Sequence, residues 1–199
     1  MNINEIDITK TTSYFDPVAV ETRKPIGKRN YPCHVIDCTI KEVRVRKKYK
    51  AKVYNLKLEI AEGCDKLKFE DDNGNEVDGK AFVGTKISAG GLFLFLNPQE
   101  GDDFEANNGG NENYLKFCQS IGYEPKEVEI KVGDEKRKVF EFPTLSKEDI
   151  INKPVMAWCD YETWTSYKDG KQYTSCKAKG FTLWEGAKDL TPKEEDLPF

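Results

Sequence analysis

The chain has 199 residues, 38% of them hydrophobic and 33% charged, and its formal net charge at pH 7 is −4. This length suits one domain with insertions and tails, and the net charge excludes a uniformly cationic surface. The sequence contains no run of about 18 apolar residues, so we expect no membrane span. Residues 1–10 lack the apolar core of a secretory signal, so we expect a cytoplasmic protein.

The first third of the chain predicts an arm and two strands. Residues 1–30 hold few apolar runs and predict an N-terminal arm. Residues 31–45 are rich in β-branched side chains and predict a long first strand, whose apolar alternation slips near Lys41 as it does at a bulge. Uneven alternation over residues 49–60 predicts the second strand.

The middle of the chain predicts an insertion, a strand and a helix. Acidic residues and a strong turn sequence predict a hairpin insertion over residues 62–79. Glycines interrupt the third strand region, 81–96, as in a sharply bent strand. A loop is predicted over 98–110, and then a helix over 113–121 that Gly122 ends.

The last third predicts two hairpins and a tail. The first hairpin is a second insertion over residues 127–142. Strands over 154–162 and 173–184 form the other, joined by a turn over 167–171 that contains the favoured pair Asp-Gly. Residues 185–199 are expected to form a flexible acidic tail.

Three strands, a helix and a two-stranded hairpin predict a mainly β fold. This order matches the OB-fold, a five-stranded Greek-key barrel, with its one helix between strands 3 and 4 and with long loop inserts. A β-sandwich is the competing architecture, but it would require more strands and no helix at that position. We therefore expect an arm over 1–30, an OB domain over 31–184 and a tail over 185–199.

Residues suited to metal binding or catalysis are scarce. The sequence has one histidine, His34, and no Cys-x-x-Cys pair, whereas a structural zinc site needs four clustered ligands. We expect no metal, no cofactor and no enzymatic activity, with reduced and mostly buried cysteines. The loop acids are expected to be solvated: Asp71, Asp72, Asp78, Asp102, Asp103 and Glu105.

The densest basic segment straddles the turn between the first two predicted strands. Glu42 is its only acid. In an OB barrel this turn flanks the binding groove, and lysine and arginine bind phosphates whatever the base sequence. A hairpin of ordinary solvated lysines is the alternative, but like charges this dense favour an anionic partner. The cations are Lys41, Arg44, Arg46, Lys47, Lys48, Lys50, Lys52 and Lys57, with Tyr49 and Tyr54 among them.

Aromatic residues crowd the last hairpin, and lysines are interleaved with them. Exposed rings stack on bases for roughly 1–3 kcal/mol each, whatever the base. Because side chains alternate along a strand, about half of these rings are expected to point inward. Trp164 and Tyr167 are the best exposed candidates, followed by Tyr49 and Tyr54. The hairpin residues predicted to bind nucleic acid are Trp158, Trp164, Tyr167, Lys168, Lys171 and Tyr173; Phe82, Phe93 and Phe95 lie on the third strand.

The last six residues are acidic and then apolar: Glu194, Glu195, Asp196, Leu197, Pro198 and Phe199. They resemble the C-terminal tip of bacterial single-stranded DNA-binding proteins. Phe199 offers a ring and a carboxylate to a pocket with a basic rim. The resemblance implies that the tip recruits partners such as polymerase, helicase, primase or recombinase, and an unspecific acidic end is the alternative.

The body resembles phage-encoded OB-fold proteins of the same class. The similarity lies in residues 47–60, in the helix end at Ile121-Gly122-Tyr123 and in residues 153–181. It implies a sequence-nonspecific protein that coats single-stranded DNA in replication, recombination or repair, in the host cell cytoplasm. The acidic inserts and the short linker before the tip differ from the bacterial proteins, so we expect a monomer or homodimer rather than a tetramer.

Two other functions fit parts of the sequence. A protein–protein adaptor or phage structural module would have the β-barrel but no salt-dependent affinity for oligonucleotides. A nuclease would need a nucleophile–base pair, for which the sequence shows no credible spacing.

Overall fold

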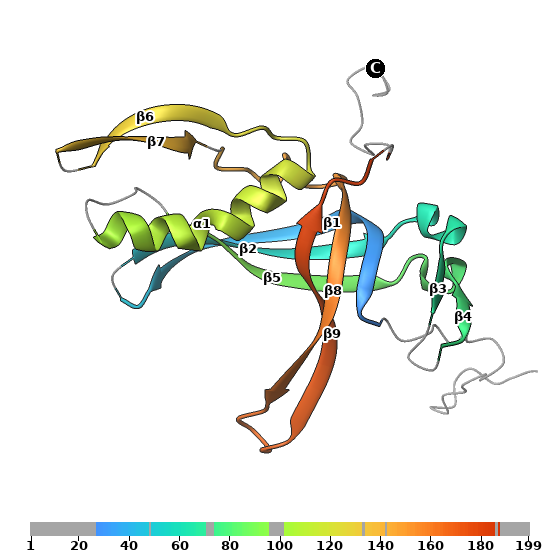
Figure 1. Ribbon diagram of the computed structural model, residues 1–199. Coiled ribbons are helices and arrows are strands. Elements are labelled where there is room, and N and C mark those ends of the chain that lie inside the picture. The colour runs from blue at the N-terminus through green and yellow to red at the C-terminus, as the bar shows by residue number, and fades with distance from the viewer. Residues whose placement is uncertain are drawn as a thin grey trace, which may run out of the picture.

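The computed structural model describes residues 27–47, 49–70, 74–95, 102–132, 134–141, 143–185 and 187. These residues form a mainly β protein with a single α-helix, α1 (Asp102–Ser120), as Figure 1 shows. The predicted fold class, mainly β with one helix, is confirmed.

A five-stranded antiparallel sheet is the centre of the molecule. Its strands lie in the order β5-β2-β1-β8-β9, so α1 follows the third of them along the chain, as predicted. No backbone ladder joins β5 to β9 within the described part of the chain, so the predicted closure into a barrel is not observed. The bounds are β1 (Arg29–Val45), β2 (Tyr49–Ile60), β5 (Lys86–Phe95), β8 (Pro154–Thr165) and β9 (Gln172–Thr182).

The length of β1 lets it pair with two different strands. Its first residues, Arg29 to His34, pair with β8, and from Cys33 onward it pairs with β2. The register with β2 shifts between Val35 and Asp37, several residues before the slip predicted near Lys41. A bulge of this kind bends a strand and increases its twist, which is how β1 serves both parts of the sheet.

Helix α1 is longer than its sequence predicts. It begins at Asp102 and runs through Gly109 and Gly110, where a loop was predicted. Each glycine costs a helix about 1 kcal/mol relative to alanine, and packing of the second half of α1 offsets this cost. Its buried Tyr114, Phe117 and Cys118 lie against the sheet.

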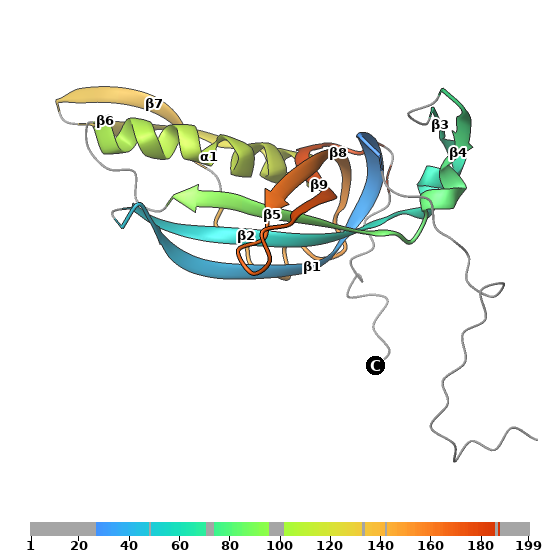
Figure 2. The same ribbon diagram turned by 90° about the horizontal axis from the view of Figure 1, so that it is seen from below.

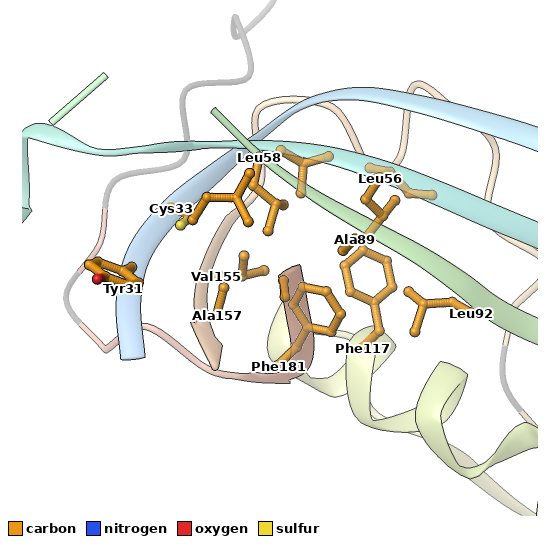
Figure 3. Close-up of a cluster of buried hydrophobic side chains, with 14 of the residues drawn as sticks. Tyr31, Cys33, Leu56, Leu58, Ala89, Leu92, Phe117, Val155, Ala157 and Phe181 are labelled. Carbon is orange, nitrogen blue, oxygen red and sulfur yellow. The ribbon is translucent and has the colours of Figure 1, made fainter. Parts of the chain in front are cut away.

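The core lies between the sheet and α1. Figure 3 shows Leu56, Leu92, Val155 and other side chains of the sheet on the same side as Phe117 of the helix. The Phe117 and Phe181 rings meet edge to face with centroids 5.2 Å apart, a geometry that aromatic quadrupoles favour.

Both predicted insertions form hairpins. The first contains the short strands β3 (Lys68–Glu70) and β4 (Glu76–Asp78) between the 3₁₀ turns η1 (Glu62–Lys66) and η2 (Gly79–Phe82). Rings of Phe69 and Phe82 pack on Tyr31 of β1 with centroids 5.6 and 5.5 Å away, which holds this insertion on the sheet. The second is the hairpin of β6 (Lys126–Val132) and β7 (Glu135–Glu141).

Two buried tyrosines join the chain after β7 to the core. The Tyr54 hydroxyl donates to the Leu145 carbonyl at 3.1 Å. The Tyr114 hydroxyl donates to the Pro143 carbonyl at 2.8 Å and accepts from the Leu145 N–H at 3.0 Å. Both rings are fully buried, and burial raises the pKa of each phenol. The neutral hydroxyls therefore act as permanent hydrogen-bonding links between the sheet, α1 and this segment.

Replacing Tyr114 with Phe should destabilise the protein. The change leaves the Leu145 N–H and the Pro143 carbonyl without their hydroxyl partner in a buried region. We expect the free energy of unfolding to fall by about 1–3 kcal/mol, measured by urea denaturation. Tyr167→Phe, at a fully exposed ring, is the matched control. An unchanged urea midpoint for Tyr114→Phe would show that the network contributes nothing to stability.

Candidate nucleic-acid interface

One side of the β8–β9 hairpin carries exposed aromatic rings. Alternation along the paired strands buries Ala157 and Cys159 and turns Trp158 and Trp164 outward. Trp164 lies directly opposite Tyr173, and their rings stack with centroids 5.9 Å apart and planes at 25°. Trp158, Trp164 and Tyr173 are 37%, 44% and 43% exposed, so each ring keeps a large surface free for a ligand.

Lysines lie beside these rings and are held there by acids. The Lys177 Nζ is 5.4 Å from the Trp164 ring centroid, and Glu162 pairs with both Lys177 (2.5 Å) and Lys179 (3.2 Å). Hydrogen bonds from Lys177 and then Lys179 lower the pKa of Glu162, so it remains ionised at neutral pH.

Nearer the end of the hairpin that pairs with β1, Lys28 takes the same position beside Trp158. Its Nζ lies 5.9 Å from the Trp158 ring centroid and 3.1 Å from an Asp160 carboxylate oxygen. We call this surface the hairpin face, formed by Lys28, Trp158, Asp160, Glu162, Trp164, Tyr173, Lys177 and Lys179.

The turn of the hairpin adds an exposed ring and two cations. Gly170 adopts a φ of 67°, and its N–H donates to the Ser166 carbonyl at 2.9 Å. Asp169 accepts from the Lys171 N–H at 3.2 Å and from the Tyr173 hydroxyl at 2.8 Å, so the turn also positions the Tyr173 ring. Tyr167, Lys168 and Lys171 project from it fully or largely exposed.

A second group of rings lies on the face of β2 and β5 that is turned away from α1. Phe95 lies opposite Ala51 and Phe93 opposite Val53, which places both on the side of Tyr49. The Phe93 and Phe95 rings stack at 6.1 Å, and Tyr49 meets Phe95 edge to face at 6.3 Å. We call this surface the ring face, formed by Tyr49, Phe93 and Phe95 with the neighbouring Lys41 of β1.

Phe93 and Phe95 were not among the residues predicted to bind. Their Phe-x-Phe spacing already places both on one face of a strand. Only the pairing register between β5 and β2 shows that this face of β5 is continuous with the face of β2 that carries Tyr49 and is turned away from the core.

The predicted role of Tyr54 is wrong. Its side chain is fully buried, its ring lies 4.9 Å from that of Tyr114, and its hydroxyl bonds to Leu145. Tyr54 is offset by an odd number of residues from Tyr49 and Val53, so it points to the opposite side of β2 and packs under α1. It is a core residue that no base can reach.

Strand alternation also divides the basic segment. Arg46 and Lys47 form the β1–β2 turn with φ values of 49° and 60° and are exposed. Arg44 pairs with Lys50 on the α1 side of the sheet, which is also the side of Lys52. Lys41 lies on the ring face, and Lys48 lies outside the described residues. The predicted cluster is therefore one exposed tip with cations on both sides of the sheet.

The β8–β9 hairpin extends from the sheet toward the side on which the ring face lies (Figure 1). Figure 1 shows α1 above the β1–β2–β5 part of the sheet and the free end of β8–β9 below it. Figure 2, seen from below, shows β8 and β9 crossing in front of that part of the sheet, with the β1–β2 tip at its far end.

The described residues contain no group of three or more His, Cys, Asp and Glu side chains placed to hold a metal ion. Burial raises the pKa of Cys38 and Cys64 to about 11 and that of Cys118 to about 12, so these thiols are protonated at neutral pH and poor nucleophiles.

None of the helices among the described residues has the length and apolar character to cross a membrane. The predicted tip, residues 194–199, lies outside the described part of the chain.

Comparison with known proteins adds no relative. No protein-family model matches the chain, and no curated protein matches it.

Proposed function

We propose that this chain is a sequence-nonspecific single-stranded DNA-binding protein of the OB type, which coats and protects DNA during replication, recombination or repair. The strand order β5-β2-β1-β8-β9 and the helix between the third and fourth strands of the sheet support an OB-type topology. In that topology, the face of strands 2 and 3 and the two flanking hairpin loops bind the ligand. Here these are the ring face, the β1–β2 tip and the β8–β9 hairpin.

The observation that carries this proposal is the run of exposed rings and lysines along the hairpin face. Trp158, Trp164 and Tyr173 keep a third or more of their surface exposed on one side of a single hairpin. Stacking on such rings requires bases whose faces are free, which a duplex does not offer, and it is sequence-tolerant because every base has a π-face.

Cations at both ends of the interface supply the phosphate contacts. Arg46 and Lys47 project from the β1–β2 tip, and Lys168 and Lys171 from the β8–β9 turn. Each phosphate that such cations neutralise releases counterions, so affinity should fall steeply with salt. The net charge of −4 does not oppose this, because the local distribution of charge governs the encounter.

The proposal extends to residues 194–199 as a partner-binding segment. Its three acids are followed by Leu-Pro-Phe, a combination that fits an apolar pocket with a basic rim. Replication or recombination proteins with such a pocket would be brought to the coated strand.

Replacing Trp164 with Ala should weaken binding to a dT oligomer by about 5- to 150-fold, because one stacking platform worth roughly 1–3 kcal/mol is lost. Fluorescence anisotropy of a labelled oligomer, titrated at several salt concentrations, measures the effect. Phe140→Ala, at a ring that is 55% exposed on β7, is the matched control and should bind normally. If neither wild type nor variant shows salt-dependent affinity for the oligomer, the exposed rings belong to a protein-binding adaptor instead.

Replacing Glu162 with Gln should strengthen binding severalfold at low salt. The carboxylate currently neutralises Lys177 and Lys179, and an amide of the same size frees both for phosphate. The slope of log K against log salt should become steeper by up to about one unit. Glu141→Gln on β7 is the control for loss of one negative charge far from the interface. Equal affinities for Glu162→Gln and wild type would remove Lys177 and Lys179 from the proposed interface.

Deleting residues 194–199 should leave DNA affinity unchanged or raise it, because the acidic segment competes with DNA for the cationic interface. The same deletion should abolish capture of partner proteins in a pull-down. The measurement is the oligomer titration described for Trp164→Ala, made side by side with the full chain. Loss of DNA binding on deletion would contradict this division of roles.

A further inference from the structure

The β6–β7 hairpin is an arm with two open edges. It is a two-stranded sheet that pairs with no other described strand, and Figure 1 shows it extending beside α1 with β6 along its upper margin. An isolated two-stranded ribbon is marginally stable in water and gains from a third strand. The outer edge of β6 therefore presents backbone N–H and C=O groups to any strand that fits it.

Two ion pairs cross the arm between β6 and β7. Glu129 pairs with Lys136 at 2.8 Å, and Glu127 pairs with Lys138 at 2.9 Å. Lys131 instead faces Lys136 directly across the hairpin and has no ion pair within the described residues. Like charges opposite each other destabilise a sheet, so an acid brought beside Lys131 from outside would be favourable.

The sequence of β6 is complementary to itself. When a second β6 runs antiparallel and the two Glu129 residues face each other, Glu127 of each strand lies opposite Lys131 of the other. Val128 then lies opposite Ile130 on the other side of the sheet. In this register, odd-numbered residues of one β6 lie opposite odd-numbered residues of the other, and even-numbered opposite even-numbered. The backbone N–H and C=O groups that point away from β7 in one copy therefore meet the corresponding groups of the other copy.

The other edge of the arm lacks this property. Strand β7 carries three consecutive cations at its centre, Lys136, Arg137 and Lys138. Two antiparallel copies of β7 centred on Lys138 would place Lys138 against Lys138 and glutamates against each other at the ends. The β6 register sets two oppositely charged pairs against the single Glu129–Glu129 contact, in which each carboxylate keeps its own Lys136, whereas the β7 register offers no oppositely charged pair. Charge complementarity therefore favours β6 as the self-pairing edge.

We propose that two copies of this chain pair through the outer edges of their β6 strands, centred on Glu129, to form a dimer with a continuous four-stranded arm sheet. Each Lys131 gains Glu127 of the second copy as a partner, and each Glu129 keeps its Lys136. The half-buried Val128 and Ile130 of each copy then cover each other.

Analytical ultracentrifugation of the full chain without DNA tests the proposal. Wild type should show a concentration-dependent dimer. Glu127→Lys and Lys131→Glu should each raise the dimer dissociation constant about tenfold, because each change creates two like-charge pairs in the symmetric interface. The double variant, with both charges exchanged, should recover the wild-type constant. Glu141→Lys on β7 is the charge-matched control and should dimerise normally.

A second variant tests the register. Glu129→Cys places two thiols opposite each other only if the strands pair about this residue, so a mild oxidant should convert it to a disulfide-linked dimer. Wild type, whose cysteines are buried or half-buried, and Glu141→Cys should remain unlinked. The proposal would be overturned if wild type stays monomeric at all concentrations or if neither charge reversal changes the dimer dissociation constant. Failure of Glu129→Cys to crosslink would also overturn it. None of these readouts involves DNA, so they are independent of the proposed function.

Discussion

Alternation of side chains along β2 divides this protein into a core and a candidate interface. One set of residues, which includes Tyr54, Leu56 and Leu58, points toward α1 and is fully buried. The other set begins with Tyr49 and faces away from the helix, where Phe93 and Phe95 of β5 join it. Because the two sets belong to the same strand, the packing of α1 on one side fixes the position of the rings on the other.

The exposed rings of the candidate interface have charged groups beside them. Lys28 and Lys177 lie beside Trp158 and Trp164, and Asp160 and Glu162 hold these lysines in place. Surface ion pairs of this kind contribute about 0–1 kcal/mol to stability, so a phosphate can displace the carboxylates at little cost. The arrangement keeps a surface rich in aromatic groups hydrated and leaves its cations available for an anionic ligand.

The two hairpin insertions are attached to the body in different ways. Phe69 and Phe82 of the first pack against Tyr31, and the Arg29 guanidinium lies 5.2 Å from the Phe69 ring centroid, so aromatic contacts hold it. The β6–β7 hairpin is followed by a segment that the Tyr54 and Tyr114 hydroxyls bind at Pro143 and Leu145. The base of this arm is therefore fixed, while its strands stay unpaired along both outer edges within the described chain.

The sequence by itself determined the mainly β class, the approximate positions of the sheet strands, both hairpin insertions and the end of α1 just before Gly122, because strand periodicity and turn residues are local properties. It also indicated that Trp158, Trp164, Tyr167 and Tyr173 include exposed rings. Only the tertiary structure decided that α1 begins at Asp102, since packing offset the helix cost of Gly109 and Gly110. It alone decided that Tyr54 is buried and that Phe93 and Phe95 join Tyr49, because the register between β2 and β5 joins residues about 40 positions apart, a pairing that no local pattern contains.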